Sequence, residues 1–251
     1  MSTMFRSTHF PVANRRRVVR LAGLAVAVLL LAGCASSGPV DNPVARNLTW
    51  FSYVAADDIR TACEAGGADS YRLIYNANFT EQVRSYDIRA LPMDGGAVMT
   101  VRVKTPVRLG ALRLTAPFTP WQATPFHRRL SSEEFGILVD MMAASGAFGP
   151  APAGLRLHSS AFYWVVAACR GGHFSFNAFL YPSRRFERIA FDDPLSRLDP
   201  SGIPFNPPIA GAGALRLPEQ CGSRRDPPPE CLYPPFVFEV EEDGLKGSAL
   251  L

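Results

Sequence analysis

Four strand-like runs, in which apolar and polar residues tend to alternate, predict β-strands in the first half of the chain. The runs are 71–75, 82–89, 97–104 and 111–115. Turn signals separate them, which favours an antiparallel meander. In 97–104 the odd positions are apolar and three of the four even positions are polar, so Arg102 and Lys104 are expected to face water.

A second group of strands is predicted later in the chain. Residues 161–169 form an unbroken apolar, β-branched and aromatic run, which is typical of a central strand covered on both faces. Gly171-Gly172 predicts a tight return, after which 173–181 alternates again. Residues 236–240 are the last predicted strand.

Two helices are also predicted. Apolar positions recur at helical spacing over 54–64, and Gly66-Gly67 follows as a stop signal. Ser131-Ser132-Glu133-Glu134 is a capping signature, and the apolar stripe after it predicts a helix to about Ser145. Residues 182–235 are dense in proline, so a long coil is expected there. The predicted fold class is α+β: an antiparallel sheet packed by one or two helices, with a long proline-rich C-terminal coil.

The first 33 residues have the charge order of an export signal. An apolar run at 21–33 follows a stretch that has no acid and contains Arg6, Arg15, Arg16, Arg17 and Arg20. A membrane-spanning helix needs about 20 apolar residues. This run has only 13, so cleavage is expected rather than permanent insertion.

The apolar run ends in Leu31-Ala32-Gly33-Cys34, which resembles the lipobox of bacterial lipoproteins. The resemblance implies cleavage before Cys34, acylation of the Cys34 thiol, and attachment of the chain to a membrane. In that family an aspartate after the cysteine favours the inner membrane. Here Ala35 follows, so the expected place is the outer membrane, facing the periplasm. An ordinary signal peptide with a chance cysteine is the alternative interpretation.

The chain is therefore expected to have four parts. They are a cleaved signal peptide at 1–33, a lipidated N-terminus and tether at 34–46, a single α+β domain at 47–240, and a loose tail at 241–251. Without the signal peptide the chain has 21 basic and 22 acidic residues, a net charge of −1. A near-neutral domain lacks the basic footprint of a nucleic-acid-binding protein, so that class of partner is excluded.

Four cysteines remain besides Cys34: Cys63, Cys169, Cys221 and Cys231. In an oxidising compartment an even number of cysteines predicts two disulfides, with three possible connectivities. The short proline-stiffened segment between Cys221 and Cys231 favours a bond between these two, which leaves Cys63 for Cys169. The spacings contain no Cys-x-x-Cys pair and no histidine at ligand distance, so neither a metal site nor a cofactor is predicted.

His173 and Ser175 are the candidate catalytic residues, because a serine near a histidine can act as a nucleophile. Residues two apart on a strand lie about 6.5 Å apart and point in parallel, however. The chain also lacks the Gly-x-Ser-x-Gly elbow of many hydrolases. A polar sheet face is therefore the simpler interpretation, and an enzyme would need His173 or His158 to face a carboxylate or serine in a cleft.

Two stretches are candidates for ligand contact. His127-Arg128-Arg129 is expected to form a solvated loop, with contact to an anion or a lipid headgroup as the alternative. A polar and aromatic stretch could line a groove for a sugar or a peptide, and consists of Tyr75, Asn76, Asn78, Gln82, Arg84, Tyr86 and Asp87.

These observations predict a non-enzymatic, lipid-anchored module that binds or scaffolds another envelope component, either a protein or a polymer. Two alternatives stay open. One is a hydrolase of an envelope polymer with a site around His173. The other is a carrier of lipid or another hydrophobic ligand, which requires a sizeable apolar cavity.

Overall fold

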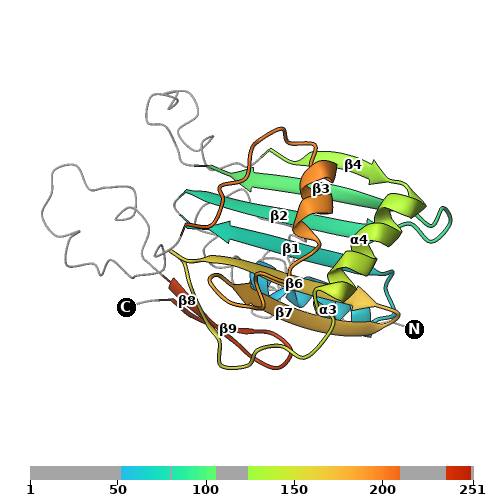
Figure 1. The fold of residues 1–251 in the computed structure, drawn as a ribbon. Coiled ribbons are helices and arrows are strands. Elements are labelled where there is room, and N and C mark those ends of the chain that lie inside the picture. Colours follow the sequence, from blue (N-terminus) through green and yellow to red (C-terminus); the bar gives the residue numbers. More distant parts are fainter. Residues whose placement is uncertain (1–51, 80, 106–123, 210–235, 250–251) are drawn as a thin grey trace, which may run out of the picture. The chain divides into compact units, whose positions relative to one another are not determined.

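Two antiparallel β-sheets, with helices packed against the larger one, make up the described part of the chain (Figure 1). The computed structural model describes residues 52–79, 81–105, 124–209 and 236–249. The larger sheet has six strands in the order β4-β3-β2-β1-β6-β7, and the smaller has three in the order β5-β8-β9. The α+β prediction, with an antiparallel sheet, is confirmed.

The elements have the following bounds. The six-stranded sheet contains β1 (Ser70–Ala77), β2 (Gln82–Ala90), β3 (Ala97–Lys104), β4 (Phe126–Leu130), β6 (Phe162–Arg170) and β7 (His173–Leu180). The three-stranded sheet contains β5 (Arg156–His158), β8 (Phe236–Val240) and β9 (Leu245–Ala249). The helices are α3 (Asp57–Glu64), α4 (Ser132–Ala144) and α5 (Asp192–Leu198).

Strands β1 and β6 are neighbouring interior strands of the larger sheet and are buried on both faces. Every residue of β6 except Arg170 is buried, as predicted for an unbroken apolar run. Strand β3 alternates between buried and more exposed positions, so its predicted assignment of faces is also confirmed. These two patterns show where the sheet is covered and where it is not.

One face of the six-stranded sheet packs against α4 and α5, which lie in front of it in Figure 1. Leu138 and Met142 of α4 and Leu195 of α5 join sheet residues such as Trp164 in this core. Helix α4 begins at the predicted capping box, in which Ser131 and Glu134 each accept a hydrogen bond from the other's backbone N–H.

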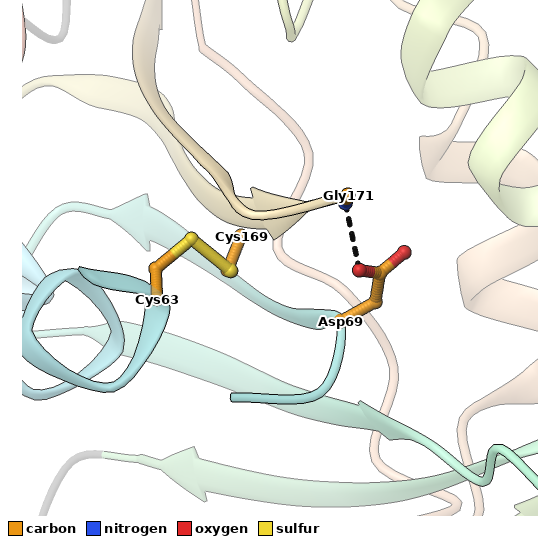
Figure 2. The surroundings of a disulfide bond; sticks show 4 residues. All are labelled: Cys63, Asp69, Cys169 and Gly171. Atoms are coloured by element: carbon orange, nitrogen blue, oxygen red, sulfur yellow. Dashed lines mark hydrogen bonds between the residues drawn. A yellow bond between two sulfur atoms is a disulfide. The ribbon is translucent and has the colours of Figure 1, made fainter. Parts of the chain in front are cut away.

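The other face packs against α3 and the three-stranded sheet. Ile59 of α3 and Phe238 of β8 belong to the same core as Ile74, Val165 and Ala167 of the larger sheet. Helix α3 contacts β6 and β7. The disulfide between Cys63 and Cys169 fixes α3 to the end of β6, with a Cα–Cα distance of 5.5 Å (Figure 2).

The Cys63–Cys169 bond is the pair that the cysteine spacing favoured, and it closes a separation of 106 residues. Beside it, the backbone N–H of Gly171 donates to Asp69 Oδ1 at 2.8 Å, which connects the β6–β7 turn to the residue before β1 (Figure 2). Cys34, Cys221 and Cys231 lie outside the described residues.

Several elements differ from the sequence prediction. His127-Arg128-Arg129 belongs to strand β4 and not to a loop, because residues 126–130 pair with 97–101 of β3. The predicted coil at 182–235 contains helix α5, and the predicted loose tail contains β9, which pairs with β8. The short strand β5 was not predicted, and the predicted strand at 111–115 lies outside the described residues.

No helix within the described ranges is both long enough and apolar enough to cross a membrane.

Candidate functional site

The candidate catalytic residues lie near the start of β7. His173 is exposed opposite Arg170, and Ser175 is half-buried opposite Ala168. Neither side chain hydrogen-bonds to a serine, histidine or carboxylate within the described part of the chain. A nucleophile–base pair is therefore not formed by these residues.

Asn177, the third polar residue of this strand, is fully buried. Its Nδ2 donates to the carbonyl oxygens of Gly146 and Gly149 at 3.1 and 3.0 Å, and Arg185 donates to its Oδ1. The amide of Asn177 thus holds the loop after α4 against β7, and its role is structural.

His158, the other histidine considered for catalysis, is half-buried on β5 opposite Val237. Its Nδ1 atom is buried and has no hydrogen-bond partner among the described residues, and burial lowers the pKa of its imidazole. Within the described ranges no group of three or more His, Cys, Asp or Glu residues could hold a metal ion.

The polar and aromatic stretch predicted to line a groove is divided between the two faces of the sheet. Tyr75, Gln82, Arg84 and Tyr86 lie on the face that packs against α5 and the segment after it. Asn76 lies on the other face, where its Nδ2 donates to the carbonyl oxygens at 159 and 161. The stretch is therefore not one continuous groove.

Arg84 forms a buried network at the centre of the first of these faces. Its side chain is 0% exposed, and Nη1 donates to Asp199 Oδ2, which is 5% exposed, at 2.6 Å. Nε donates to Gln82 Oε1 at 3.0 Å, and Nη2 donates to the carbonyl oxygens of Ile203 and Pro204. The free-energy cost of removing the Arg84 charge from water is offset by these charge-assisted hydrogen bonds.

The segment 199–206 completes this network and covers the sheet there; we call it the strap. Gln82 Nε2 donates to the Pro204 carbonyl at 3.0 Å, and Gln82 Oε1 accepts from the Asn206 N–H at 3.1 Å. The Phe205 ring lies 4.0 Å from the Arg84 guanidinium carbon and against the rings of Tyr86 and Trp164. The predicted groove for a peptide is thus filled by the chain itself.

Tyr86 donates from its hydroxyl to the same Asp199 oxygen at 2.7 Å. Burial, and then the negative charge of Asp199, raises the pKa of Tyr86 above its usual range, so the phenol stays protonated and keeps donating. This face therefore has little left to offer a ligand.

Arg72 forms the second network, on the opposite face. Nε donates to Asp87 Oδ1 at 2.6 Å, and Nη1 and Nη2 donate to the two oxygens of Asp58 at 2.7 and 2.9 Å. Nη1 also donates to the carbonyl of Tyr53, whose ring lies 3.8 Å from the guanidinium carbon. These contacts attach α3 and the residues before it to the sheet.

The charge of Arg72 affects the titration of Asp58. Burial by itself would raise the pKa of this carboxyl, but the hydrogen bond and the positive charge of Arg72 outweigh burial and lower the pKa below its usual value. The ion pair therefore contributes stability only while Asp58 is ionised.

One part of the larger sheet remains accessible. Helix α3 and the three-stranded sheet pack behind β1, β6 and β7, and the same side of β3 and β4 carries exposed or half-exposed side chains. We call this surface the open face, and it consists of Arg89, Val98, Thr100, Arg102, Lys104, His127 and Arg129.

The open face is organised by cross-strand pairs. Arg89 lies opposite Val98, and Val98 lies opposite Arg129 in the next strand. In the neighbouring row, Thr100 Oγ1 and His127 Nδ1 are 3.1 Å apart. Arg128, whose side chain points the other way, pairs with Glu134 and so does not belong to this surface.

The open face carries more basic than acidic groups. Arg102 pairs with Asp87 at 3.1 Å, and Arg129 pairs with Asp94. Lys104 donates to the Phe79 carbonyl at 3.1 Å, and Arg89 forms no ion pair with a described residue. Counted over the described residues named here, four basic side chains stand against the two carboxylates of Asp87 and Asp94, so basic groups outnumber acidic ones on this surface.

Sequence reasoning identified His127 and Arg129 but missed Arg89 and Val98. The signal was present in the alternation of β2 and β3, since Arg89 and Val98 occupy outward positions of their strands. The pairing that brings them together with β4 was not predicted.

Comparison with known protein families, curated proteins and solved structures found no match to this chain.

Proposed function

We propose that this protein is a non-enzymatic, lipid-anchored module of the bacterial envelope that works by binding through its open face. The Leu31-Ala32-Gly33-Cys34 sequence supports the anchor, because it closes a short apolar run behind a cluster of arginines. Cys34 is the residue that would carry the lipid, and the outer membrane facing the periplasm is the proposed place.

The open face is the observation that carries the proposal of binding. Elsewhere the described arginines with the lowest exposure, Arg72 and Arg84, are saturated by carboxylates and carbonyls. At the open face, by contrast, Arg89 and His127 are exposed on regular strands. Rigid elements that present polar side chains to solvent favour recognition of a partner.

The two alternative functions, hydrolysis of an envelope polymer and carriage of a hydrophobic ligand, stay predictions. Hydrolysis needs a nucleophile and a base in one cleft. Support for it is lacking among the described residues, where His158 Nδ1 has no hydrogen-bond partner and His173 is exposed on β7. Carriage of a hydrophobic ligand needs a vacant apolar cavity, whereas Phe205 of the strap fills the aromatic surface over Trp164.

Site-specific photo-crosslinking in living bacteria tests the proposal. The full chain is produced with a photo-reactive amino acid in place of Val98 on the open face, or in place of Ile137 on α4. Val98 is 37% exposed and Ile137 is 48% exposed, so the two positions are matched in access to solvent. Adducts to envelope protein, polymer or lipid at position 98 but not at 137 are expected. Equal yields at both positions, or none at 98, would contradict the proposal.

The anchor is tested separately with Cys34→Ala. The wild-type chain is expected to incorporate a labelled fatty acid and to fractionate with membranes. The variant is expected to incorporate none. Labelling of the variant at the wild-type level would remove the lipoprotein assignment.

A further inference from the structure

We propose that the partner of the open face is the surface of an anionic phospholipid bilayer, with Met93 entering the interfacial region and Arg89 and Arg129 meeting lipid phosphates. This inference rests on the proposed function, because it names the occupant of the same surface. Four observations on the described residues carry it: an exposed apolar tip, a basic row, a turn that fixes the tip in place, and the position at which the chain enters the domain.

The apolar tip is Met93, in the turn between β2 and β3. Its side chain is 95% exposed, which is the highest exposure of any large hydrophobic residue in the described part of the chain. Val98, 37% exposed, lies near the same end of β3. A flexible and polarizable methionine side chain adapts readily to an apolar environment, so Met93 is suited to insert where one is offered.

The basic row borders this tip. Arg89 and Arg129 lie on either side of Val98 across three adjacent strands, and Arg89 forms no ion pair with a described residue. Arginine presents a planar fork of donors that matches phosphate oxygens. Apolar side chains flanked by arginine are a combination that suits the boundary between headgroups and acyl chains.

The turn that carries Met93 is fixed by its own contacts. The N–H groups of Asp94 and Gly95 donate to the Leu91 carbonyl at 3.2 and 3.1 Å, and Arg129 pairs with the Asp94 carboxylate. At Gly96 a Cβ atom would lie 2.4 Å from the Leu130 carbonyl oxygen, so only glycine lets the turn approach the end of β4. Met93 is therefore presented by a defined structure next to Arg129.

The N-terminal end of the described chain lies on the same face. The Tyr53 hydroxyl donates to Asp87 Oδ2 at 2.8 Å, and that oxygen also accepts from Arg102 of the open face. From Cys34 to Ser52 the chain can span at most about 65 Å. A lipid on Cys34 would thus keep the domain within reach of the membrane and give the open face a high effective concentration at its surface.

A lipid surface fits these features better than a protein does. Protein interfaces usually have an apolar centre and a polar rim. Here the middle of the open face is polar, with Thr100, Arg102 and His127, and the most exposed apolar side chain stands at its edge. A row of basic groups with one apolar tip suits a surface of phosphates over hydrocarbon.

Hydrogen–deuterium exchange on the full chain tests this inference. The protein is reconstituted in vesicles of phosphatidylcholine alone, or of phosphatidylcholine with a quarter phosphatidylglycerol. Peptides that cover 91–96 are expected to exchange several-fold more slowly in the anionic vesicles. Arg89→Glu is expected to abolish the difference and Met93→Ser to reduce it.

Two control variants make the same changes on the opposite side of the sheet. Arg197→Glu on α5 reverses the charge of an arginine that is 67% exposed, and Ile137→Ser on α4 removes an exposed apolar side chain. Both are expected to keep the wild-type protection of 91–96. Unfolding midpoints of all four variants show that each one folds.

Equal exchange of 91–96 in the two kinds of vesicle would overturn membrane docking, and so would full protection in Arg89→Glu. If protection is absent and the residue at position 98 still crosslinks to a protein in cells, membrane docking is wrong while the proposed binding function stands. If both signals are absent, both proposals fail.

Discussion

The two sides of strand β2 place arginines in opposite surroundings. Arg84 is enclosed by Asp199, Gln82 and the carbonyl groups of the strap, and its side chain is 0% exposed. Arg89, five residues further along the same strand, is exposed beside Val98 and forms no ion pair with a described residue. Nothing in the residue type separates them, since both are arginines of one strand and differ only in the face of the sheet on which they lie.

The difference shows that coverage by distant parts of the chain decides what an arginine does here. The strap comes from 115 residues further along the sequence and supplies the carboxylate for Arg84. Arg72 is an intermediate case, because it is buried but its partner Asp58 is 52% exposed. A covered arginine stabilises the fold, and we expect an uncovered one to be available to a partner.

The largest expected effect concerns the part of the sheet that α3 covers, on the same side as the open face. Replacing Cys63 and Cys169 together by alanine removes the bond between α3 and β6, and on the chain-entropy account lowers the free energy of unfolding by about 4–5 kcal/mol. Urea denaturation of the oxidised protein measures the loss. Reduction of the wild type also breaks the predicted Cys221–Cys231 bond, so it is expected to cause a loss at least as large. An unchanged midpoint in the variant would contradict the role of the Cys63–Cys169 bond.

The next largest effect on stability is expected in the buried network around Arg84. Asp199→Asn leaves the buried Arg84 guanidinium without its carboxylate and is expected to lower the free energy of unfolding by about 3 kcal/mol or more. The matched control is Asp193→Asn, which removes a surface pair with Arg197 in which both side chains are about 70% exposed. That control is expected to change stability by less than about 0.5 kcal/mol. Similar losses in both variants would refute the contrast between buried and surface pairs.

A smaller effect on stability, which depends on pH, is expected at the ion pair between Asp58 and Arg72. The folded-state pKa of Asp58 is lowered, so its contribution is present above the ordinary aspartate pKa of about 3.9 and is lost as the pH falls through the lower folded value. Because Asp58 is half-exposed, the contribution is expected to be below about 1 kcal/mol. The stability difference between wild type and Asp58→Asn should therefore shrink between pH 6 and pH 2. A constant difference over that range would contradict the ion pair.

The smallest effect on stability is expected at the open face. Arg89→Glu should change the free energy of unfolding by no more than about 0.5 kcal/mol, because the side chain is exposed and has no described ion pair to lose. Thermal unfolding of wild type and variant measures this. A loss comparable to that of Asp199→Asn would mean that Arg89 is structural.

The parts of the fold that were predictable from sequence are those in which local pattern and tertiary burial agree. The alternation in β3, the apolar run of β6 and the capping box at Ser131 each specify their element without help from distant residues. The pairing of Cys63 with Cys169 followed from the short spacing of the other two cysteines.

The missed elements depend on neighbours or on misleading local signals. Helix α5 has Pro194 in its first turn, where proline costs little, yet proline-rich sequence favours coil when read alone. Strand β4 is short and carries three consecutive basic residues, and it is held by its pairing with β3. Strand β9 is likewise defined by its partner β8.

The candidate site was predictable only in fragments. The residues Tyr75, Gln82, Arg84 and Tyr86 were recognised as a polar and aromatic set, but the strap that fills their surface lies more than 100 residues away. Met93 gave no signal of its own, and the alternation of β2 could place Arg89 outward but could not show that no described element covers it.

Arginine footprinting compares the two kinds of arginine within one unaltered protein. Intact bacteria and the purified folded protein are treated with phenylglyoxal, and the modified residues are quantified by mass spectrometry. Arg84 is expected to stay unmodified in both samples, and Arg197 to react in both. Arg89 is expected to react in the purified protein and to be protected in cells, where its partner is present. Equal reaction of Arg89 in cells and in the purified protein would contradict the claim that the open face is the binding surface.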